Sequence, residues 1–369
     1  MRKVLQGLGL AGVVALSLSV MLSAAAAPVA DAAMKRDLEA VRTLIKGGAD
    51  VNAAQGDGMT ALHWASRNGD AELAQMLLFA GANVKATTRL GGYTPLLLAA
   101  EQGHAAVISA LLAAGADAKA ANALGTTALM MAASSGNATA VTSLVENGAE
   151  IEAREKTFGQ TPLMFATANN RVDAIKALIK AGADLKATSK VVNVGTLSSQ
   201  EQEFLAQASG SGAQPGGGGQ GRAGQVVAPG APAAGAGGGG RRGGGGGKPG
   251  IDRPFFYNEL IGTQGGVTAL MLASRGGYTD AVKTLVAAGA DVNQVSAGDK
   301  TSPLLIAAIN GHFDLAQWLL EQGANPNAAA ENGVTPLYAA LNVTWAPRAL
   351  YPQPRAYNQQ QTTYLSFMK

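Results

Sequence analysis

Residues 90–123 form the repeating unit of this chain and read Leu-Gly-Gly-Tyr-Thr-Pro-Leu-Leu-Leu-Ala-Ala-Glu-Gln-Gly-His-Ala-Ala-Val-Ile-Ser-Ala-Leu-Leu-Ala-Ala-Gly-Ala-Asp-Ala-Lys-Ala-Ala-Asn-Ala. A Thr/Ser-Pro/Ala-Leu signature recurs along the chain and begins at Thr60, Thr94, Thr127, Thr161, Thr268, Ser302 and Thr335. Neighbouring signatures lie 33 or 34 residues apart, except that Thr161 and Thr268 are separated by 107. A fixed period near 33 residues predicts a solenoid of stacked units.

Each unit is predicted to contain two short helices. Thr94 can cap the first helix with its hydroxyl group, and Pro95 suits the first helical position, where its missing N–H is harmless. The second helix carries one apolar stripe, formed in this unit by Val107, Ile108, Leu111 and Leu112. A glycine follows the second helix in each copy, where a left-handed backbone ends a helix most cheaply: Gly48, Gly81, Gly115, Gly148, Gly182, Gly289 and Gly323.

Two short motifs resemble the ankyrin repeat family. The helix start Thr60-Ala61-Leu62-His63 is similar to the family's Thr-Pro-Leu-His, and Gly48-Ala49-Asp50-Val51-Asn52 is similar to the start of its finger loop. The resemblance implies an all-α solenoid of about eight helix–turn–helix repeats. The signature His occurs only at His63, so we expect apolar packing to replace most of its hydrogen bonds between repeats. Its equivalents are Leu97, Met130, Met164, Met271, Leu305 and Tyr338.

The repeat pattern divides the chain into five segments. We predict a signal peptide at 1–26, repeats one to five at 27–188, an insertion at 189–261, repeats six and seven at 262–329, and a partial eighth repeat at 330–369. The last repeat lacks the polar cap that an open solenoid end requires, so we expect the chain to be a fragment.

The first 26 residues have the pattern of a secretory leader. Arg2 and Lys3 precede an uncharged apolar run that ends in small residues, which predicts cleavage after Ala26 and a periplasmic or secreted protein. The alternative is an uncleaved membrane anchor, because no charged residue occurs from Val4 to Ala30.

Composition excludes several classes of function. The formal charge is +3, and removing Arg2 and Lys3 with the leader leaves +1, a balance that does not favour nucleic acid as a partner. The chain has no Cys, which rules out disulfides, thiolate nucleophiles and Cys-based zinc sites.

The insertion has three parts. Residues 198–205 carry a capping-box pattern and predict a short helix. Residues 209–250 hold 20 of the 49 glycines and should be a disordered spacer, since neither an Arg/Gly RNA-binding pattern nor a phosphate loop is well formed there. Residues 251–261 are rich in apolar and aromatic side chains, which either pack on the repeats or form a binding hot spot.

Two groups of residues are candidates for binding a partner. In the ankyrin pattern the residue before the signature Thr and the two before the inter-helix Gly face a concave groove, which places there Met59, Arg67, Asn68, Tyr93, Glu101, Gln102, Ser134, Ser135, Gln160 and Asn169. Aromatic and Arg side chains dominate interface hot spots, so Arg67, Asn68, Tyr93, Glu101 and Gln102 are favoured.

The second group lies in a Pro-rich loop, predicted to start at Asn342, that replaces the usual inter-helix turn. It comprises Trp345, Arg348, Tyr351, Arg355 and Tyr357. The alternative is a loop that packs back on the repeats. A second helix should then follow, with Tyr364, Leu365 and Met368 on its buried stripe.

No residue set predicts catalysis, a cofactor or a metal site, because His63, His104 and His312 lie in separate repeats at family consensus positions. We therefore expect a monomeric exported scaffold that binds another protein, with membrane association only through an uncleaved leader. Two alternatives stay open. One is an accessory part of an envelope enzyme whose catalytic domain is missing from this chain, and the other is a module that binds a small molecule or a glycan.

Overall fold

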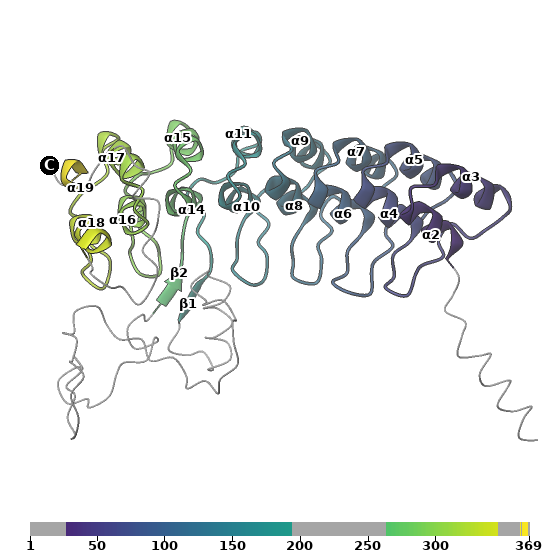
Figure 1. The fold of residues 1–369 in the computed structure, drawn as a ribbon, viewed down its shortest axis with the longest axis horizontal. Coiled ribbons are helices and arrows are strands. Elements are labelled where there is room, and N and C mark those ends of the chain that lie inside the picture. The colour runs from purple at the N-terminus through teal and green to yellow at the C-terminus, as the bar shows by residue number, and fades with distance from the viewer. Residues whose placement is uncertain (1–26, 194–262, 346–361, 363, 368–369) are drawn as a thin grey trace, which may run out of the picture. The chain divides into compact units, whose positions relative to one another are not determined.

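A computed structural model describes residues 27–193, 263–345, 362 and 364–367 (Figure 1). Contacts between residues divide the chain into two compact units, 1–185 and 186–369. The predicted leader, the helix at 198–205, the glycine tract and the aromatic segment at 251–261 lie outside the described residues.

Residues 27–185 of the first unit form a row of five helix pairs, and Figure 1 shows the second helix of each pair lying above the first. We call the first helix of a pair the inner helix and the second the outer helix. The pairs are α2 (Pro28–Met34) and α3 (Leu38–Lys46), α4 (Ala61–Asn68) and α5 (Ala71–Phe79), α6 (Pro95–Gln102) and α7 (Ala105–Ala113), α8 (Ala128–Ser135) and α9 (Ala138–Glu146), and α10 (Pro162–Ala168) and α11 (Val172–Lys180).

Within its described residues, the second unit contains one short strand pair and three helix pairs. Together with the five pairs of the first unit, these confirm the predicted eight paired-helix repeats. The elements are β1 (Val191–Asn193), β2 (Thr263–Gly265), α14 (Ala269–Gly276) and α15 (Thr279–Ala287), α16 (Pro303–Ile309) and α17 (Phe313–Glu321), and α18 (Pro336–Trp345) and α19 (Tyr364–Phe367).

The helix boundaries follow from the residues predicted to make them. Thr94 Oγ1 accepts a hydrogen bond from the N–H of Leu97 at 3.3 Å, and Pro95 occupies the first turn of α6. The stripe Val107, Ile108, Leu111 and Leu112 of α7 is at most 8 % exposed. The glycines that follow the outer helices have φ between 80° and 98°, as the sequence predicted.

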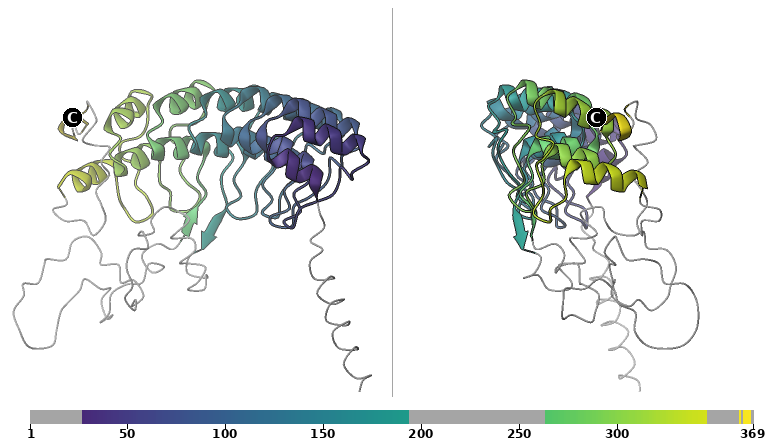
Figure 2. Two further views of the ribbon diagram at one scale, coloured as in Figure 1. Left: turned by 45° about the vertical axis from the view of Figure 1, so that its right-hand side comes forward. Right: turned by 90° about the vertical axis from the view of Figure 1, so that its left-hand side faces the viewer.

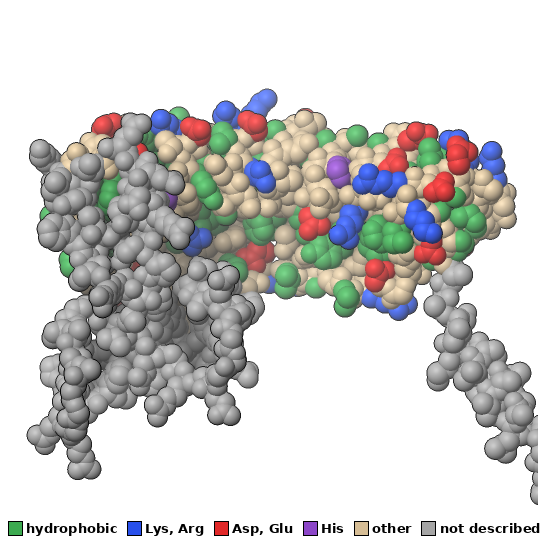
Figure 3. Space-filling view, viewed as in Figure 1, with side chains coloured by type: hydrophobic (Ala, Val, Ile, Leu, Met, Phe, Trp, Pro, Cys, Tyr) green, Lys and Arg blue, Asp and Glu red, His purple; other side chains and the backbone are tan. Residues whose placement is uncertain are grey.

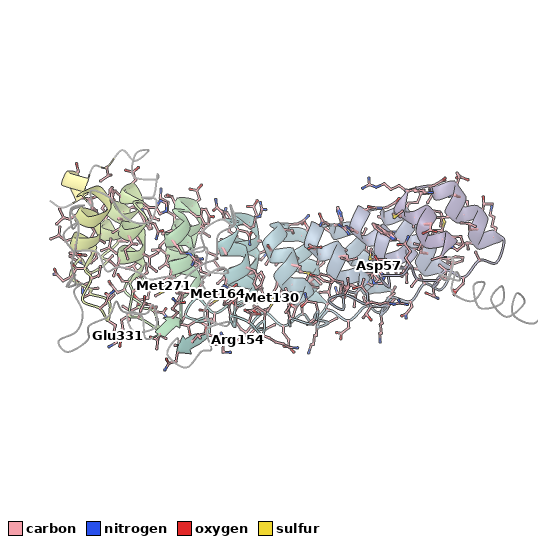
Figure 4. The ribbon with its side chains drawn as sticks, turned by 60° about the horizontal axis from the view of Figure 1, so that its bottom comes forward. Asp57, Met130, Arg154, Met164, Met271 and Glu331 are labelled. Atoms are coloured by element: carbon pink, nitrogen blue, oxygen red, sulfur yellow. The ribbon has the colours of Figure 1, made fainter. Side chains whose placement is uncertain are left out.

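A finger loop connects each helix pair to the next, and in both views of Figure 2 the fingers of each unit extend from the inner-helix side. Backbone hydrogen bonds link neighbouring fingers of the first unit. The N–H of Arg89 donates to the carbonyl of Asp57 at 2.8 Å, and the N–H of Lys156 donates to the carbonyl of Leu124 at 2.9 Å. Figure 4 shows Asp57 and Arg154 on fingers, and Met130 and Met164 on inner helices. Inner helices and fingers together form what we call the inner face.

Two glycines of repeat two provide a matched test of packing between repeats. Gly69 and Gly81 both have a left-handed backbone, with φ of 74° and 87°. A Cβ atom at Gly69 would lie 2.6 Å from the imidazole ring of His104, whereas one at Gly81 would meet nothing within 4 Å. We expect Gly81→Ala to cost about 1 kcal/mol of unfolding free energy from backbone strain alone.

Gly69→Ala should cost more, about 2–3 kcal/mol, because it also displaces His104 from its contact with the preceding repeat. Urea unfolding of the full chain, followed by circular dichroism, measures both variants. Equal shifts of the two unfolding midpoints would show that crowding of His104 by the new Cβ atom adds nothing to the loss of unfolding free energy.

A two-stranded antiparallel ribbon, which the sequence did not predict, lies in the second unit. Val191 pairs with Gly265, Val192 with Gln264 and Asn193 with Thr263. The ribbon continues where the N–H of Ser189 donates to the carbonyl of Val267 at 2.9 Å. Residues 193 and 263 therefore lie side by side, and the inserted segment leaves and rejoins the repeats at one point.

The structure corrects one detail of the last repeat. We predicted a loop from Asn342, but α18 continues to Trp345, because the Gly that ends α6 at position 103 is replaced here by Thr344 and the next helix breaker is Pro347. The side chains of Tyr364, Leu365 and Met368, which we predicted on the buried stripe of the last helix, lie outside the described part of the structure, and their burial stays a prediction. In α19 the side chain of Phe367 is 7 % exposed and stacks on Phe313.

Candidate protein-interaction surface

The inner face of the first unit carries an apolar side chain at the same position of four successive inner helices, one residue after the signature His position. These residues are Trp64, Leu98, Met131 and Phe165. Leu98 and Met131 are 7 % and 8 % exposed, whereas Trp64 and Phe165 are half-buried. The two aromatic side chains therefore offer contact area to a partner.

Trp64 is held by neighbours from three elements, a group that we call the Trp64 cluster (Asp31, Gln55, Trp64 and Arg67). The indole Nε1–H donates to Gln55 Oε1 at 2.8 Å, and Gln55 Nε2–H donates to Asp31 Oδ1 at 2.6 Å. The guanidinium carbon of Arg67 lies 5.8 Å from the centre of the indole ring. These bonds fix the indole on the inner face before any partner arrives.

The Trp64 cluster has the composition of an interface hot spot. Trp and Arg are the residues most enriched among side chains whose loss costs more than about 2 kcal/mol of binding energy. A cation over an aromatic ring contributes about 0.5–1 kcal/mol at an exposed site. Because the ring and guanidinium are already ordered, binding loses little side-chain entropy at this position.

His63 lies next to Trp64 in the sequence and joins two repeats. The N–H of Thr60 donates to His63 Nδ1 at 3.2 Å, so the neutral ring carries its proton on Nε2, which donates to the carbonyl of Tyr93 at 3.1 Å. At the equivalent position of two other repeats, a Met side chain makes one of the two hydrogen bonds that His63 makes. Met130 Sδ and Met271 Sδ accept the N–H of Thr127 and Thr268 at 3.4 and 3.5 Å, which replaces the first of these bonds.

Burial lowers the pKa of His63 below its ordinary value of 6.5, against the opposing hydrogen bond to Tyr93. The unfolded chain therefore binds a proton more readily than the fold does, and stability falls as pH drops from about 6.5 toward the lower pKa of the folded state. We expect His63→Met to flatten the dependence of unfolding free energy on pH in that window. His312 is unchanged in this variant. Because burial also lowers the pKa of His312, part of the pH dependence of stability remains.

Urea unfolding at several pH values between about 5 and 7.5 measures this effect. Leu97→Met, at the same position of the next repeat, is the control and should leave the pH dependence unchanged. An unaltered pH slope in His63→Met would contradict the assignment.

The sequence-predicted inner-face residues lie in neighbouring repeats of the first unit. Arg67, Glu101 and Gln102 are exposed, and Asn68 and Tyr93 are half-buried. Asn68 also holds repeats one and two together, since its Oδ1 accepts from Arg36 and its Nδ2–H donates to the carbonyl of Ala33, both at 3.5 Å.

One residue predicted at this surface is buried, and one residue of the surface was not predicted. Met59 was placed in the groove, but it is 6 % exposed and belongs to the core. Trp64 was missed, although its position in register with Leu98, Met131 and Phe165 was a usable signal.

The second predicted group lies almost entirely outside the described residues. Trp345 ends the backbone of α18, but its side chain is outside the described part. Arg348, Tyr351, Arg355 and Tyr357 all lie outside it, and their role in binding stays a prediction.

Besides the Trp64 cluster, a group of metal ligands or a depression would mark a candidate site among the described residues. Among them, no group of three His, Asp or Glu side chains is placed to hold a metal. A depression of about 530 Å³ lies between α9 and α11, and one of about 410 Å³ lies beside α15 and α17; neither is lined by the Trp64 cluster. In the same described part, every helix is too short or too polar to cross a bilayer.

Comparison with protein families identifies the repeats. The model for ankyrin repeats in groups of three copies matches residues 29–122, 96–189 and 270–351, which is more than half of the chain. The chain belongs to the ankyrin repeat family. Ankyrin repeats imply a scaffold for protein–protein interaction, and the family is typically non-catalytic.

Known relatives share short stretches with this ankyrin chain. A putative ankyrin repeat-containing protein of Treponema pallidum is 40 % identical over 76 residues, which is 21 % of this chain and 26 % of the relative. The B-cell lymphoma 3 protein homolog of Mus musculus is 39 % identical over 75 residues, 20 % of this chain and 17 % of the relative. Protein HOS4 of Saccharomyces cerevisiae is 41 % identical over 66 residues, 18 % of this chain and 6 % of the relative.

Proposed function

We propose that this chain is an exported, monomeric ankyrin scaffold without catalytic activity, which binds a second protein through the inner face of its first unit. The observation that carries the proposal is the Trp64 cluster. An indole fixed by a hydrogen bond to Gln55 and covered on one side by Arg67 has the chemistry of an interface anchor.

Export is supported by the sequence of the leader and by the position of the first helix. Ala27 is 3 % exposed, and α2 begins at Pro28 and packs against α3 and α4. Cleavage after Ala26 would leave this first repeat whole. The mature protein would then lie in the periplasm or outside the cell. A leader that is not cleaved would instead anchor the protein in the membrane.

The absence of catalysis is supported by what the three histidines do. His63, His104 and His312 each place Nε2 within 3.3 Å of a backbone carbonyl of a neighbouring repeat. Their rings join repeats to each other, so each Nε2 is engaged by the backbone and not by a nucleophile.

Affinity capture from the native host tests this function with two matched variants of the tagged full chain. The inner-face variant is Trp64→Ala with Arg67→Ala. The outer-face variant is Phe79→Ala, which removes an aromatic side chain that is 97 % exposed at the end of α5. Proteins captured by both wild type and Phe79→Ala, but lost from the inner-face variant, are the expected result.

Recovery of the same proteins by all three chains would contradict the proposed surface. The captured wild-type protein also reports on export. Its N-terminus, read by mass spectrometry, should begin at Ala27 in the envelope or secreted fraction, and a chain that retains Met1 in the cytoplasm would contradict the export proposal.

A further inference from the structure

The second unit has a depression of about 410 Å³ beside its outer helices α15 and α17. This volume lies in the range of about 300–1,000 Å³ that is typical of small-molecule sites. Both helices contribute side chains to the lining, which consists of Thr279, Lys283, Asp314, Gln317, Trp318, Glu321 and Thr362. The depression therefore combines one large aromatic side chain with several polar groups.

Trp318 distinguishes this depression from the rest of the outer helices. The same position of six other outer helices holds a smaller or more flexible residue, which is Thr43, Met76, Ala110, Ser143, Ala177 or Thr284. The larger depression between α9 and α11 has no aromatic residue among the described residues that line it. The indole of Trp318 is half-buried, so packing already holds it, and it offers an ordered apolar platform to a ligand.

The polar part of the lining suits hydroxyl groups better than ions. Lys283 supplies one positive charge, and Asp314 and Glu321 supply two negative charges, so an ionic ligand of either sign meets a like charge. Figure 3 likewise shows acidic and basic side chains close together over these outer helices. A hydroxyl group both donates and accepts, and can therefore bond to the carboxylates, to the amide of Gln317 and to the ammonium group.

Two printed contacts show how these polar groups are held. The ammonium nitrogen of Lys283 lies 6.0 Å from the centre of the Trp318 indole, on a flexible stem that can turn its N–H donors toward a ligand. Asp314 is more firmly placed, because its Oδ1 accepts the N–H of Thr362. The platform thus has an adaptable donor and a fixed acceptor in the same depression.

We propose that this depression binds a neutral saccharide, whose C–H face packs on Trp318 while its hydroxyl groups bond to Gln317 and Glu321. A pyranose ring matches the lining because its faces are apolar and its hydroxyl groups project from its rim. Lys283 and Glu321 are exposed, so the site is open to solvent and we expect a dissociation constant of about 1–10 mM. The site lies on the second unit and does not depend on the inner face of the first.

Saturation-transfer difference NMR on the full chain tests this site. The probes are the neutral disaccharides maltose, cellobiose and diacetylchitobiose, each titrated to about 50 mM. Glucose, glucosamine and glucuronate then compare a neutral, a cationic and an anionic sugar of the same ring size. Sorbitol has the hydroxyl groups of a sugar without a ring face.

Three variants localise any binding to the depression. Trp318→Ala removes the platform, and Gln317→Ala with Glu321→Ala removes two hydrogen-bonding groups from the surface of α17. The matched control is Gln75→Ala with Met76→Ala, at the positions of α5 that correspond to Gln317 and Trp318. Ala is the best helix former, so all three variants should fold, and thermal unfolding checks this.

We expect at least one neutral disaccharide to bind. Its affinity should fall at least about tenfold in Trp318→Ala and at least about threefold in the double variant of α17, and it should stay within about twofold of wild type in the control. Glucose should bind more tightly than glucosamine and glucuronate, and sorbitol should not compete with the disaccharide.

Two outcomes would overturn the inference outright, which are no saturation transfer from any neutral disaccharide at about 50 mM, and binding that Trp318→Ala leaves unchanged. Tighter binding of glucosamine or glucuronate than of glucose would also overturn it, in favour of an ionic site. Competition by sorbitol would reject recognition of the ring face. Each of these results would leave the proposed function standing, because the Trp64 cluster lies on the first unit.

Discussion

Trp64→Ala is expected to weaken binding of the captured partner by about thirtyfold or more, which corresponds to at least about 2 kcal/mol. The indole is half-buried, hydrogen-bonded to Gln55 and covered by Arg67, so its loss removes contact area and frees both neighbours. Replacing one ordered aromatic anchor by a methyl group should raise the dissociation rate more than it lowers the association rate. Biolayer interferometry of the full chain against the purified partner measures both rates.

Two further variants distinguish lost contact from lost stability. Trp64→Phe keeps an aromatic ring without the Nε1–H donor and should give an intermediate affinity. Phe79→Ala removes an aromatic side chain from an outer helix and should leave affinity unchanged. If Trp64→Ala binds as tightly as wild type, the Trp64 cluster is not the anchor.

Phe313→Ala is expected to lower the unfolding free energy of the last repeats by about 3–5 kcal/mol. Phe313 begins α17, is 2 % exposed, and stacks on Phe367 of α19 with ring centres 5.7 Å apart. Its loss leaves a cavity and removes the stacking contact with Phe367 of α19. Hydrogen exchange followed by mass spectrometry should show faster exchange in α16, α17 and α19.

The same exchange experiment includes its own controls. Repeats contact only their neighbours, so α2 to α7 should exchange at the wild-type rate in Phe313→Ala. Phe79→Ala should leave exchange unchanged throughout, since Phe79 is 97 % exposed. Uniformly faster exchange along both units would mean that the repeats unfold as one cooperative body.

The sequence was enough to predict the helices because each boundary has its own local cause. Thr94 caps α6 and Pro95 starts it, while the spacing of Val107, Ile108, Leu111 and Leu112 specifies the buried face of α7. These signals act within a few residues, and the Thr/Ser-Pro/Ala-Leu signature repeats seven times along the chain. The boundary at Trp345 was missed because the eighth repeat lacks the inter-helix Gly that marks the end of the inner helix in five other copies, at Gly69, Gly103, Gly136, Gly277 and Gly311.

The ribbon and the Trp64 cluster could not be predicted in this way. β1 and β2 pair across the whole insertion, and three residues on each side carry too little β-strand pattern to reveal a partner so distant in sequence. The contact between Trp64 and Gln55 joins a helix to a finger, and the bond from Gln55 to Asp31 joins two repeats. Repeat alignment places these residues near the inner face, but only the folded geometry shows that they hold one another.

The predicted groove residues illustrate the same limit. Register alone put Met59 and Tyr93 in equivalent places, yet Met59 is buried in the core while Tyr93 stays half-buried. Arg67 was selected for its residue type, and the structure adds the aromatic ring against which it lies.

Site-specific photo-crosslinking tests the central claim, that the inner face of the first unit is the binding surface, most directly. A photoreactive phenylalanine analogue replaces Leu124 on a finger, which is 60 % exposed, or Phe79 on the outer helix α5. In the native host, illumination should join the Leu124 position to a second protein and leave the Phe79 position without that adduct. The same adduct from Phe79, with none from Leu124, would contradict the account.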